Sequence, residues 1–486
     1  MIYPLLKKIG LHSVIYGIGN MSYAIPGFVL IPLYTRFLAP FEYGIYSLLT
    51  MLFGILLYIY EFGMVASSMR QFYEHNDEHK RKEVLSTAFF FILIYGVTLT
   101  AVLYFFRGTI SQFLFKTTGF GHIVAIGLCA VFFQSLIAIP QTSIRLKEKP
   151  VLYIILLSGQ LLALVVFNIL FIAVLRQGLL GIYRALLVVS IIAFLAYLLS
   201  ALRNFNFRFN FAELKELLYL GGAYFPALLL TWIIDSSDRY ILDIFTDLSS
   251  VGIYSLGYKI GQVPLLLVKS FALGWLPIMF SIAKSDKPEY VFGKIGTYFV
   301  LGISFFVFGL SLYSKEIISI LASANYIEAY RVVFLICLSY LFYGLYIFFL
   351  TGLTIKKRIY SLPLVLVIGA IVNIALNFLL IPRFGMMGAA VATLISYISI
   401  ALATYYFSQK CYYIAYEVKK ITIIIASGVV IYILSMFFRV DNIFLSAGIK
   451  TGFLLTYVIS LYLFHIISRE DIAKIKSVFA RLLRNS

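Results

Sequence analysis

The sequence predicts an all-α protein that crosses a membrane many times. Of its 486 residues, 62% are hydrophobic and only 12% are charged, and a soluble domain of this composition would expose large apolar patches. Long apolar runs alternate with short segments rich in lysine and arginine. A helix of about 20 apolar residues spans the hydrocarbon core of a bilayer. Barrel strands would instead alternate apolar and polar residues over about ten residues, so these uninterrupted runs predict helices.

Fourteen transmembrane helices follow from the apolar runs when their boundaries are placed at charged residues. The expected spans are residues 11–37, 43–69, 84–106, 121–144, 151–175, 179–202, 216–243, 249–282, 290–313, 330–354, 361–382, 386–409, 420–438 and 444–467. The first run is too long for the apolar region of a signal peptide, so we expect it to remain as the first helix. The tail after Ser468 has apolar residues at helical spacing between basic ones, which predicts an amphipathic helix on the inner membrane surface.

Basic residues test this count independently, because lysine and arginine are in excess in short cytoplasmic loops. If the N-terminus is cytoplasmic, every second connection is basic, as at residues 80–82, 145–149 and 356–358. The alternation predicts a multi-pass protein of the cell membrane with both termini in the cytoplasm. It also accounts for most of the net charge of +18 through topology and anionic lipid headgroups, without nucleic acid.

An internal repeat is visible in two pairs of short segments. The pentapeptide Gly44-Ile-Tyr-Ser-Leu48 recurs 208 residues later as Gly252-Ile-Tyr-Ser-Leu256. At nearly the same separation, Arg176-Gln-Gly-Leu-Leu-Gly181 is echoed by Arg383-Phe-Gly-Met-Met-Gly388. Many transporters build a central pathway from two duplicated halves around a shared axis. The repeat therefore favours a transporter.

Ionisable residues inside the predicted spans are the candidate functional groups, because each costs roughly a few kcal/mol unless it is paired or faces water. The cations are Arg184, Arg239, Lys259 and Lys269, and the acids are Glu61, Asp235 and Asp238. The excess of cations favours an anionic substrate. Polar residues also form helical stripes on the first, second, seventh and eighth spans, which predicts a wet cavity between them. Its expected polar lining includes Asn20, Tyr23, Thr231 and Gln262.

Five of these residues have more specific interpretations. Glu61 and Lys269 occupy matching positions of the repeat, so they are either a stabilising ion pair across the axis or a pair that forms and breaks as the halves move. Asp235 and Arg239 are four residues apart, a spacing typical of an ion pair within one helix. Lys259 has no acidic neighbour on its own helical face, which favours a place on an anionic substrate path.

The sequence gives little sign of an enzyme. It has no Walker motif, HExxH, GxSxG or long loop with a carboxylate cluster. His75 and His79 are four residues apart and could hold a metal on a helix, but a solvated face is the better interpretation. The three cysteines are scattered without metal-binding spacing. We therefore predict no catalytic residue, metal site or cofactor.

Several segments resemble Wzx-type polysaccharide flippases, which belong to the multidrug, oligosaccharidyl-lipid and polysaccharide exporter superfamily. The segments are IPLYTRFLAPFEYGIYSL at residues 31–48, SDRYIL at 237–242, VGIYSLGYKIG at 251–261 and NIALNFLLIPRFG at 373–385. The resemblance implies two six-helix lobes and two extra helices. The expected parts are an N-terminal lobe at residues 1–210, a C-terminal lobe at 211–410, and the last two helices with the cytoplasmic tail at 411–486.

The resemblance also implies a substrate. Family members move undecaprenyl-pyrophosphate-linked oligosaccharides from the cytoplasmic to the outer leaflet by alternating access, for surface polysaccharides such as O-antigen or capsule. Positions that match the family's cationic lumen are Arg36, Arg239, Lys259 and Lys269. Because no ATP motif is present, an H⁺ or Na⁺ gradient is the expected energy source, with Glu61, Asp235 and Asp238 as candidates for coupling or gating. Expected partners are membrane lipids, glycosyltransferases and a polysaccharide polymerase.

Three other functions stay open at this point. A multidrug antiporter of the same superfamily would expel organic cations, and its cavity should be acidic. A lipid II flippase would share the fold and the anionic substrate class. A membrane enzyme such as a polysaccharide polymerase or acyltransferase would be expected to carry a long outside loop or a carboxylate and histidine constellation, and neither is seen in the sequence.

Overall fold

A computed structural model describes residues 27–358, 362–438, 440 and 442–466. Within these ranges every regular element is a helix. Thirteen helices are long and apolar enough to cross a membrane, and the shorter apolar helix Gly27–Phe37 lies in the first predicted span. The prediction of an all-α, polytopic membrane protein is confirmed, and fourteen spans fit this count. The start of the first span and the predicted amphipathic tail lie outside the described residues.

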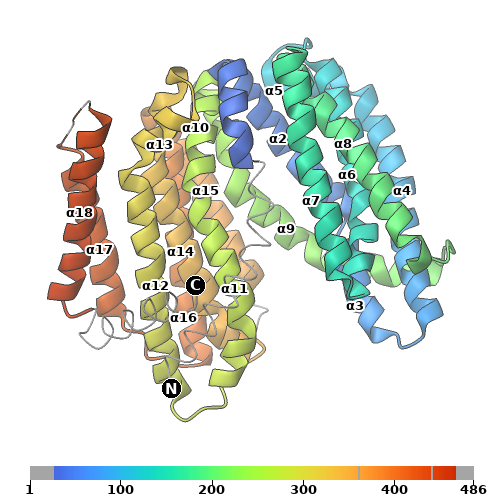
Figure 1. The fold of residues 1–486 in the computed structure, drawn as a ribbon. Helices are drawn as coiled ribbons and strands as arrows, with labels where there is room; N and C mark the ends of the chain where they lie inside the picture. Colours follow the sequence, from blue (N-terminus) through green and yellow to red (C-terminus); the bar gives the residue numbers. More distant parts are fainter. Residues whose placement is uncertain (1–26, 359–361, 439, 441, 467–486) are drawn as a thin grey trace, which may run out of the picture.

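Two bundles of helices stand side by side in Figure 1. The first bundle contains α2 (Pro40–Glu61), α3 (Met64–Glu74), α4 (Glu78–Phe105), α5 (Arg107–Phe115), α6 (Gly121–Leu146), α7 (Pro150–Asn168) with a π-helical end (Ile169–Val174), and α8 (Gly178–Ala201). The second bundle contains α10 (Leu248–Gly261), α11 (Val263–Ile282), α12 (Pro288–Leu312), α13 (Ser314–Leu321), α14 (Tyr330–Ile355), α15 (Leu362–Phe384) and α16 (Met386–Cys411). The last two helices, α17 (Val418–Ser435) and α18 (Ile443–Leu463), lie at the outer side of the second bundle.

The helix order repeats between the bundles. The first residue of α10 lies 208 positions after that of α2, and the first residue of α16 lies 208 positions after that of α8. The short helices α5 and α13 also correspond, although neither was predicted from the sequence. Helices of nine and eight residues are too short to appear as spans in a search for apolar runs.

Helix α9 (Phe211–Phe245) runs obliquely between the bundles and contacts both of them. Its first half packs on the first bundle, where a Cβ added to Gly63 would lie 2.5 Å from the carbonyl oxygen of Gly221. Gly63 also has a φ of 72°, which a residue with a side chain rarely adopts. The second half of α9 packs on α15 and α16. The lobe boundary near residue 211 stays a prediction, because this helix joins both bundles.

The two last helices are fixed to the second bundle by packing and by one ion pair. The ring of Phe308 on α12 fills the space beside Gly428 on α17, where an added Cβ would lie 1.9 Å from the ring. Lys450 on α18 lies 2.6 Å from the carboxylate of Glu316 on α13. Ser446 donates a second hydrogen bond of 2.7 Å to the same carboxylate. These contacts lie away from the contact between the two bundles.

Candidate functional site

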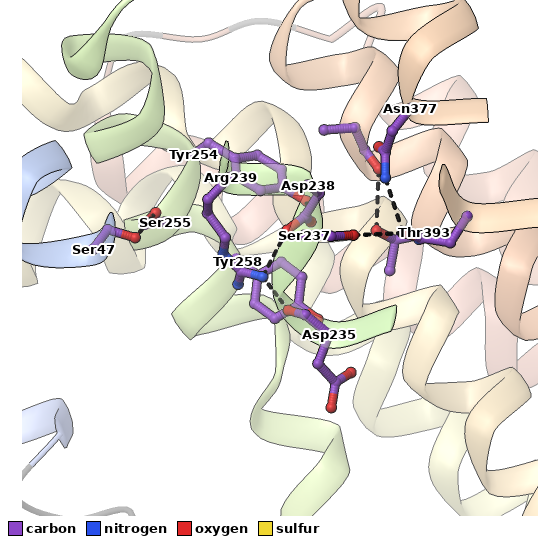
Figure 2. Close-up of polar contacts among 12 residues, drawn as sticks. Ser47, Asp235, Ser237, Asp238, Arg239, Tyr254, Ser255, Tyr258, Asn377 and Thr393 are labelled. Carbon is purple, nitrogen blue, oxygen red and sulfur yellow. Dashed lines mark hydrogen bonds and ion pairs between the residues drawn. The ribbon is translucent and has the colours of Figure 1, made fainter. Parts of the chain in front are cut away.

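The two copies of the repeated pentapeptide lie against each other where α2 crosses α10. A Cβ added to Gly44 would lie 1.9 Å from the carbonyl oxygen of Leu248, and one added to Gly252 would lie 2.1 Å from that of Pro40. Only glycine allows backbones to approach this closely. Next to this crossing, the hydroxyls of Ser47 and Ser255 are 2.5 Å apart (Figure 2). Because these serines are equivalent in the repeat, the axis that relates the two halves passes close to them.

Two adjoining cavities lie beside this crossing, and we call them together the central cavity. The first has a volume of about 380 Å³ and is bounded by α2, α9 and α10. The second has a volume of about 370 Å³ and is bounded mainly by α9, α10, α11 and α14. The residues that line both are Ser236, Arg239, Tyr258 and Gln262. A cavity is therefore present between the spans that were predicted to enclose one.

Arg239 stands at the centre of this cavity with its charge compensated. Its guanidinium lies 2.8 Å from a carboxylate oxygen of Asp238 and also donates to the backbone carbonyl of Asp235. The same group lies 3.8 Å from the ring centroid of Tyr258, which is a cation–π contact. The arginine side chain is only 11% exposed. These contacts orient a buried cation toward both parts of the cavity.

Asp235 and Asp238 on α9 accept hydrogen bonds from helices of the second bundle. Asp238 is fully buried, and its other carboxylate oxygen accepts a 2.5 Å hydrogen bond from the hydroxyl of Tyr254. The carboxylate of Asp235 accepts a hydrogen bond from Tyr397 on α16 and points away from Arg239 in Figure 2. The ion pair predicted between Asp235 and Arg239 is therefore not formed, because Asp238 replaces Asp235 as the partner.

Neutral polar side chains hold α9 to α15. Ser237 donates to the side-chain oxygen of Asn373 at 3.2 Å, and the side-chain nitrogen of Asn377 donates to the same oxygen at 2.9 Å. Asn373 and Asn377 are both fully buried. Buried polar groups of this kind stabilise a structure when they are hydrogen-bonded and thereby fix the position of a helix. Ser237 thereby joins α9 to α15 two residues before Arg239, while the side-chain nitrogen of Asn373 and the side-chain oxygen of Asn377 are buried without a hydrogen-bond partner among the described residues.

Two lysines complete the cationic lining. Lys259 on α10 is partly buried and lines the first part of the cavity. Lys269 on α11 is exposed and lines the second part. Neither lysine forms a salt bridge with any residue in the described ranges. Three cations and one carboxylate, that of Asp235, therefore line the central cavity.

Glu61 lies elsewhere. It lines a cavity of about 320 Å³ inside the first bundle, together with Gln134, Gln141, Arg145 and Gln160. Lys269 lines the central cavity, so the two residues line different cavities in this conformation. Among the described residues no salt bridge joins them. The pairing suggested by their repeat positions is not found here.

Two further residues that were predicted to line the cavity, Arg36 and Thr231, line neither part of it. Arg36 is exposed near the end of the helix Gly27–Phe37 and lines neither part of the central cavity. Thr231 is exposed, and its hydroxyl donates to the carbonyl of Ala227. Asn20 and Tyr23 lie outside the described residues.

Sequence reasoning missed Trp232 and Ser236 on α9, and Tyr43, Tyr46 and Tyr58 on α2, as cavity residues. The spacing of Trp232, Ser236 and Arg239 would have indicated this face of α9, because residues at i, i+4 and i+7 share one side of a helix. Within the described ranges no group of three or more His, Cys, Asp or Glu side chains could hold a metal ion.

Comparison with known proteins finds one matching protein family and two similar flippases. The family described as "Polysaccharide biosynthesis protein" matches residues 5–283, more than half of the chain. A probable low-salt glycan biosynthesis flippase, Agl15 of Haloferax volcanii, is 22% identical over 211 residues. The probable flippase AglR of the same organism is 29% identical over 171 residues. The alignments cover 43% of this chain and 43% of Agl15, and 33% of this chain and 34% of AglR, so the matched region spans less than half of each relative.

Solved structures agree on the fold. The lipid II flippase MurJ in an inward closed conformation has a TM-score of 0.74 and 16% identity, over 94% of this chain and 98% of that chain. An inward-facing multidrug resistance transporter of the MATE family has a TM-score of 0.66 and 13% identity, over 80% and 94% of the two chains. At these identities the likeness establishes the fold alone. The fold matches the superfamily that the sequence motifs suggested.

Proposed function

The chain belongs to the polysaccharide biosynthesis protein family, and on this premise we propose that it is a flippase for a lipid-linked oligosaccharide. The observation that carries the proposal is the cationic lining of the central cavity. Neither Lys259 nor Lys269 forms a salt bridge with a described residue, and both line the cavity that Arg239 lines. Unpaired cations at membrane depth are costly unless they meet an anion or water.

The substrate class we propose is an undecaprenyl-pyrophosphate-linked oligosaccharide. Arginine and lysine form charge-assisted hydrogen bonds with phosphate oxygens, so these side chains suit a pyrophosphate. Hydroxyl and aromatic groups of α2 line the same cavity and suit a sugar: Tyr46, Ser47, Thr50 and Tyr58. The polyprenyl tail would stay in the lipid between the bundles. An antiporter of organic cations would be served better by an acidic cavity, and here cations outnumber carboxylates.

We expect Lys259→Ala to lower transport about tenfold or more, because one charge-assisted contact with the pyrophosphate is lost. Surface polysaccharide, measured in the source strain with its own gene replaced by the variant, reports the effect at equal protein abundance. Lys419→Ala on α17 is a matched control, since Lys419 is exposed and lies outside the central cavity. Normal polysaccharide in the Lys259 variant would remove this lysine from the path. Normal polysaccharide after deletion of the gene, with loss of peptidoglycan precursor export, would favour a lipid II flippase.

Transport is proposed to run from the cytoplasmic to the outer leaflet, with both termini in the cytoplasm of a cell-membrane protein. Asp77 lies between α3 and α4, in a connection that the basic residues assign to the inside. A cysteine at this position should resist an impermeant thiol reagent added to intact cells and react after the membrane is permeabilised. Labelling of intact cells at this site would reverse the proposed orientation.

A gradient of H⁺ or Na⁺ is proposed to drive the cycle, because the sequence carries no nucleotide-binding motif. Asp235 is the carboxylate that lines the central cavity, while Glu61 lines its own cavity and Asp238 is bound to Arg239. In vesicles that contain the purified protein, collapse of the coupling gradient should slow transport of the lipid-linked oligosaccharide several-fold. Equal rates with and without each gradient would show that the flip is not coupled to either ion.

Other proteins are expected to act before and after this one. Glycosyltransferases would assemble the oligosaccharide on the lipid, and a polymerase would use it after the flip. Genes for both beside this gene would support the proposal and narrow the glycan. Neighbouring genes for drug resistance alone would weigh against it.

A further inference from the structure

We propose that Trp232 is a sugar-binding platform in the central cavity, separate from the cationic residues that hold the pyrophosphate. This inference rests on the proposed function and assigns the place of the first sugars. It makes Trp232 a specificity-determining residue for the glycan.

The two tryptophans of the chain have opposite environments. Trp275 is only 4% exposed, and its indole nitrogen donates to the hydroxyl of Thr351 at 3.1 Å. Trp232 is partly exposed and lines the first part of the central cavity. Its indole N–H makes no hydrogen bond with any residue in the described ranges. A partly exposed indole N–H without a partner in the protein can donate a hydrogen bond to a ligand in the cavity.

The α2 side of the cavity beside Trp232 is polar. The edge of the indole packs on α2 at Gly54, where an added Cβ would lie 3.4 Å from the indole nitrogen. The hydroxyl-bearing residues Ser47, Thr50 and Tyr58 line the same cavity from the same helix. Sugars present apolar ring faces that stack on aromatic rings and hydroxyls that exchange hydrogen bonds. Both kinds of contact are available here.

Trp232 is also placed correctly with respect to the cations. Trp232, Ser236 and Arg239 all line the first part of the cavity from one face of α9. Seven residues of helix separate Trp232 from Arg239 by about 10 Å along the axis. An anion held at Arg239 and Lys259 would therefore leave the sugar attached to it in reach of the indole. Charge and sugar would be bound at different points of one cavity.

A role of Trp232 in packing alone makes a different prediction. If the indole only fills space between α2 and α9, its removal should weaken the binding of undecaprenyl pyrophosphate and of the lipid-linked oligosaccharide equally, or should weaken neither. If the indole stacks on sugar, its removal should weaken only the binding of the lipid that carries sugar. Loss of Lys259 should have a different effect. It should weaken the binding of both lipids, because both carry the pyrophosphate.

The experiment measures binding of two probes to the full-length purified protein. The probes are undecaprenyl pyrophosphate and the lipid-linked oligosaccharide extracted from cells that lack this protein. We expect Trp232→Ala to weaken binding of the oligosaccharide probe about tenfold and to leave undecaprenyl pyrophosphate unchanged. Trp232→Phe, which keeps a smaller ring, should retain most of the affinity. Lys259→Ala should weaken the binding of both probes.

Fluorescence provides a measurement that does not depend on removing the indole. In a Trp275→Phe protein, Trp232 is the single tryptophan, because the chain has two. The oligosaccharide probe should change its emission, and undecaprenyl pyrophosphate should change it much less. Equal effects of both probes, in fluorescence or in the Trp232→Ala affinities, would overturn the sugar platform and leave the flippase proposal intact. If neither probe binds the wild-type protein, the proposed function fails and the platform fails with it.

Discussion

Oxidation of a Ser47→Cys, Ser255→Cys protein should stop transport, and reduction should restore it. The two hydroxyls are 2.5 Å apart, so thiols at these positions are close enough for a disulfide of about 2.05 Å. This bond would tie α2 to α10 beside the crossing of Gly44 and Gly252. In alternating access the two halves must separate on this side to release the substrate. A covalent bond here would hold the cavity closed at that end through the whole cycle.

The measurement is the rate of transport in vesicles before oxidation, after oxidation and after reduction. Each single cysteine variant is a control, because it can be oxidised without forming this bond. The native cysteines Cys129, Cys337 and Cys411 are replaced by serine in every variant so that no other pair can form. Transport at the wild-type rate by fully cross-linked protein would show that α2 and α10 stay together throughout the cycle. The halves would then have to open elsewhere.

The spans and the repeat could be predicted from the sequence because both depend on local patterns. Apolar length sets the number of helices, and a repeated pentapeptide marks equivalent positions in the halves. The rotation of α9 could not be predicted in this way. A stripe through Thr231, Asp235, Asp238 and Arg239 was expected to face the cavity. Asp235 and Arg239 do line it, but Thr231 does not, and the two carboxylates accept hydrogen bonds from Tyr397 and Tyr254. These partners come from α16 and α10, so no pattern within α9 reveals them.

The same reasoning explains why one pair of repeat positions is in contact and another is not. Residues related by a two-fold axis touch only if they lie near the axis. Ser47 and Ser255 do, because α2 and α10 cross there. Glu61 lies roughly 20 Å further along its helix, where it lines a cavity inside the first bundle. Equivalence in a repeat therefore predicts similar surroundings and not contact.

Loss of either partner of the Arg239 and Asp238 ion pair should destabilise the protein and lower transport. Asp238 is fully buried and Arg239 is 11% exposed, with 2.8 Å between guanidinium and carboxylate. Removing one member of a buried pair leaves an uncompensated charge and costs about 3–5 kcal/mol. We therefore expect Asp238→Asn and Arg239→Gln each to lower the thermal unfolding temperature in detergent. In the Asp238→Asn protein, transport should fall in proportion to the amount of folded protein. In the Arg239→Gln protein, transport should fall by more than the amount of folded protein does.

The double variant Asp238→Asn, Arg239→Gln separates the structural role of the pair from the role of Arg239 in the cavity. Neutral amides of similar shape leave no unpaired charge, so most of the lost stability should return. Transport should not return, because the cavity has lost a cation that faces the pyrophosphate. The pair of Glu316 and Lys450 is the matched control, since its atoms are 2.6 Å apart but line no part of the central cavity. Neutralising both of its members should leave transport near the wild-type rate. Full transport by the Asp238 and Arg239 double variant, at equal expression, would restrict Arg239 to a structural role and leave Lys259 and Lys269 as the cations that meet the substrate.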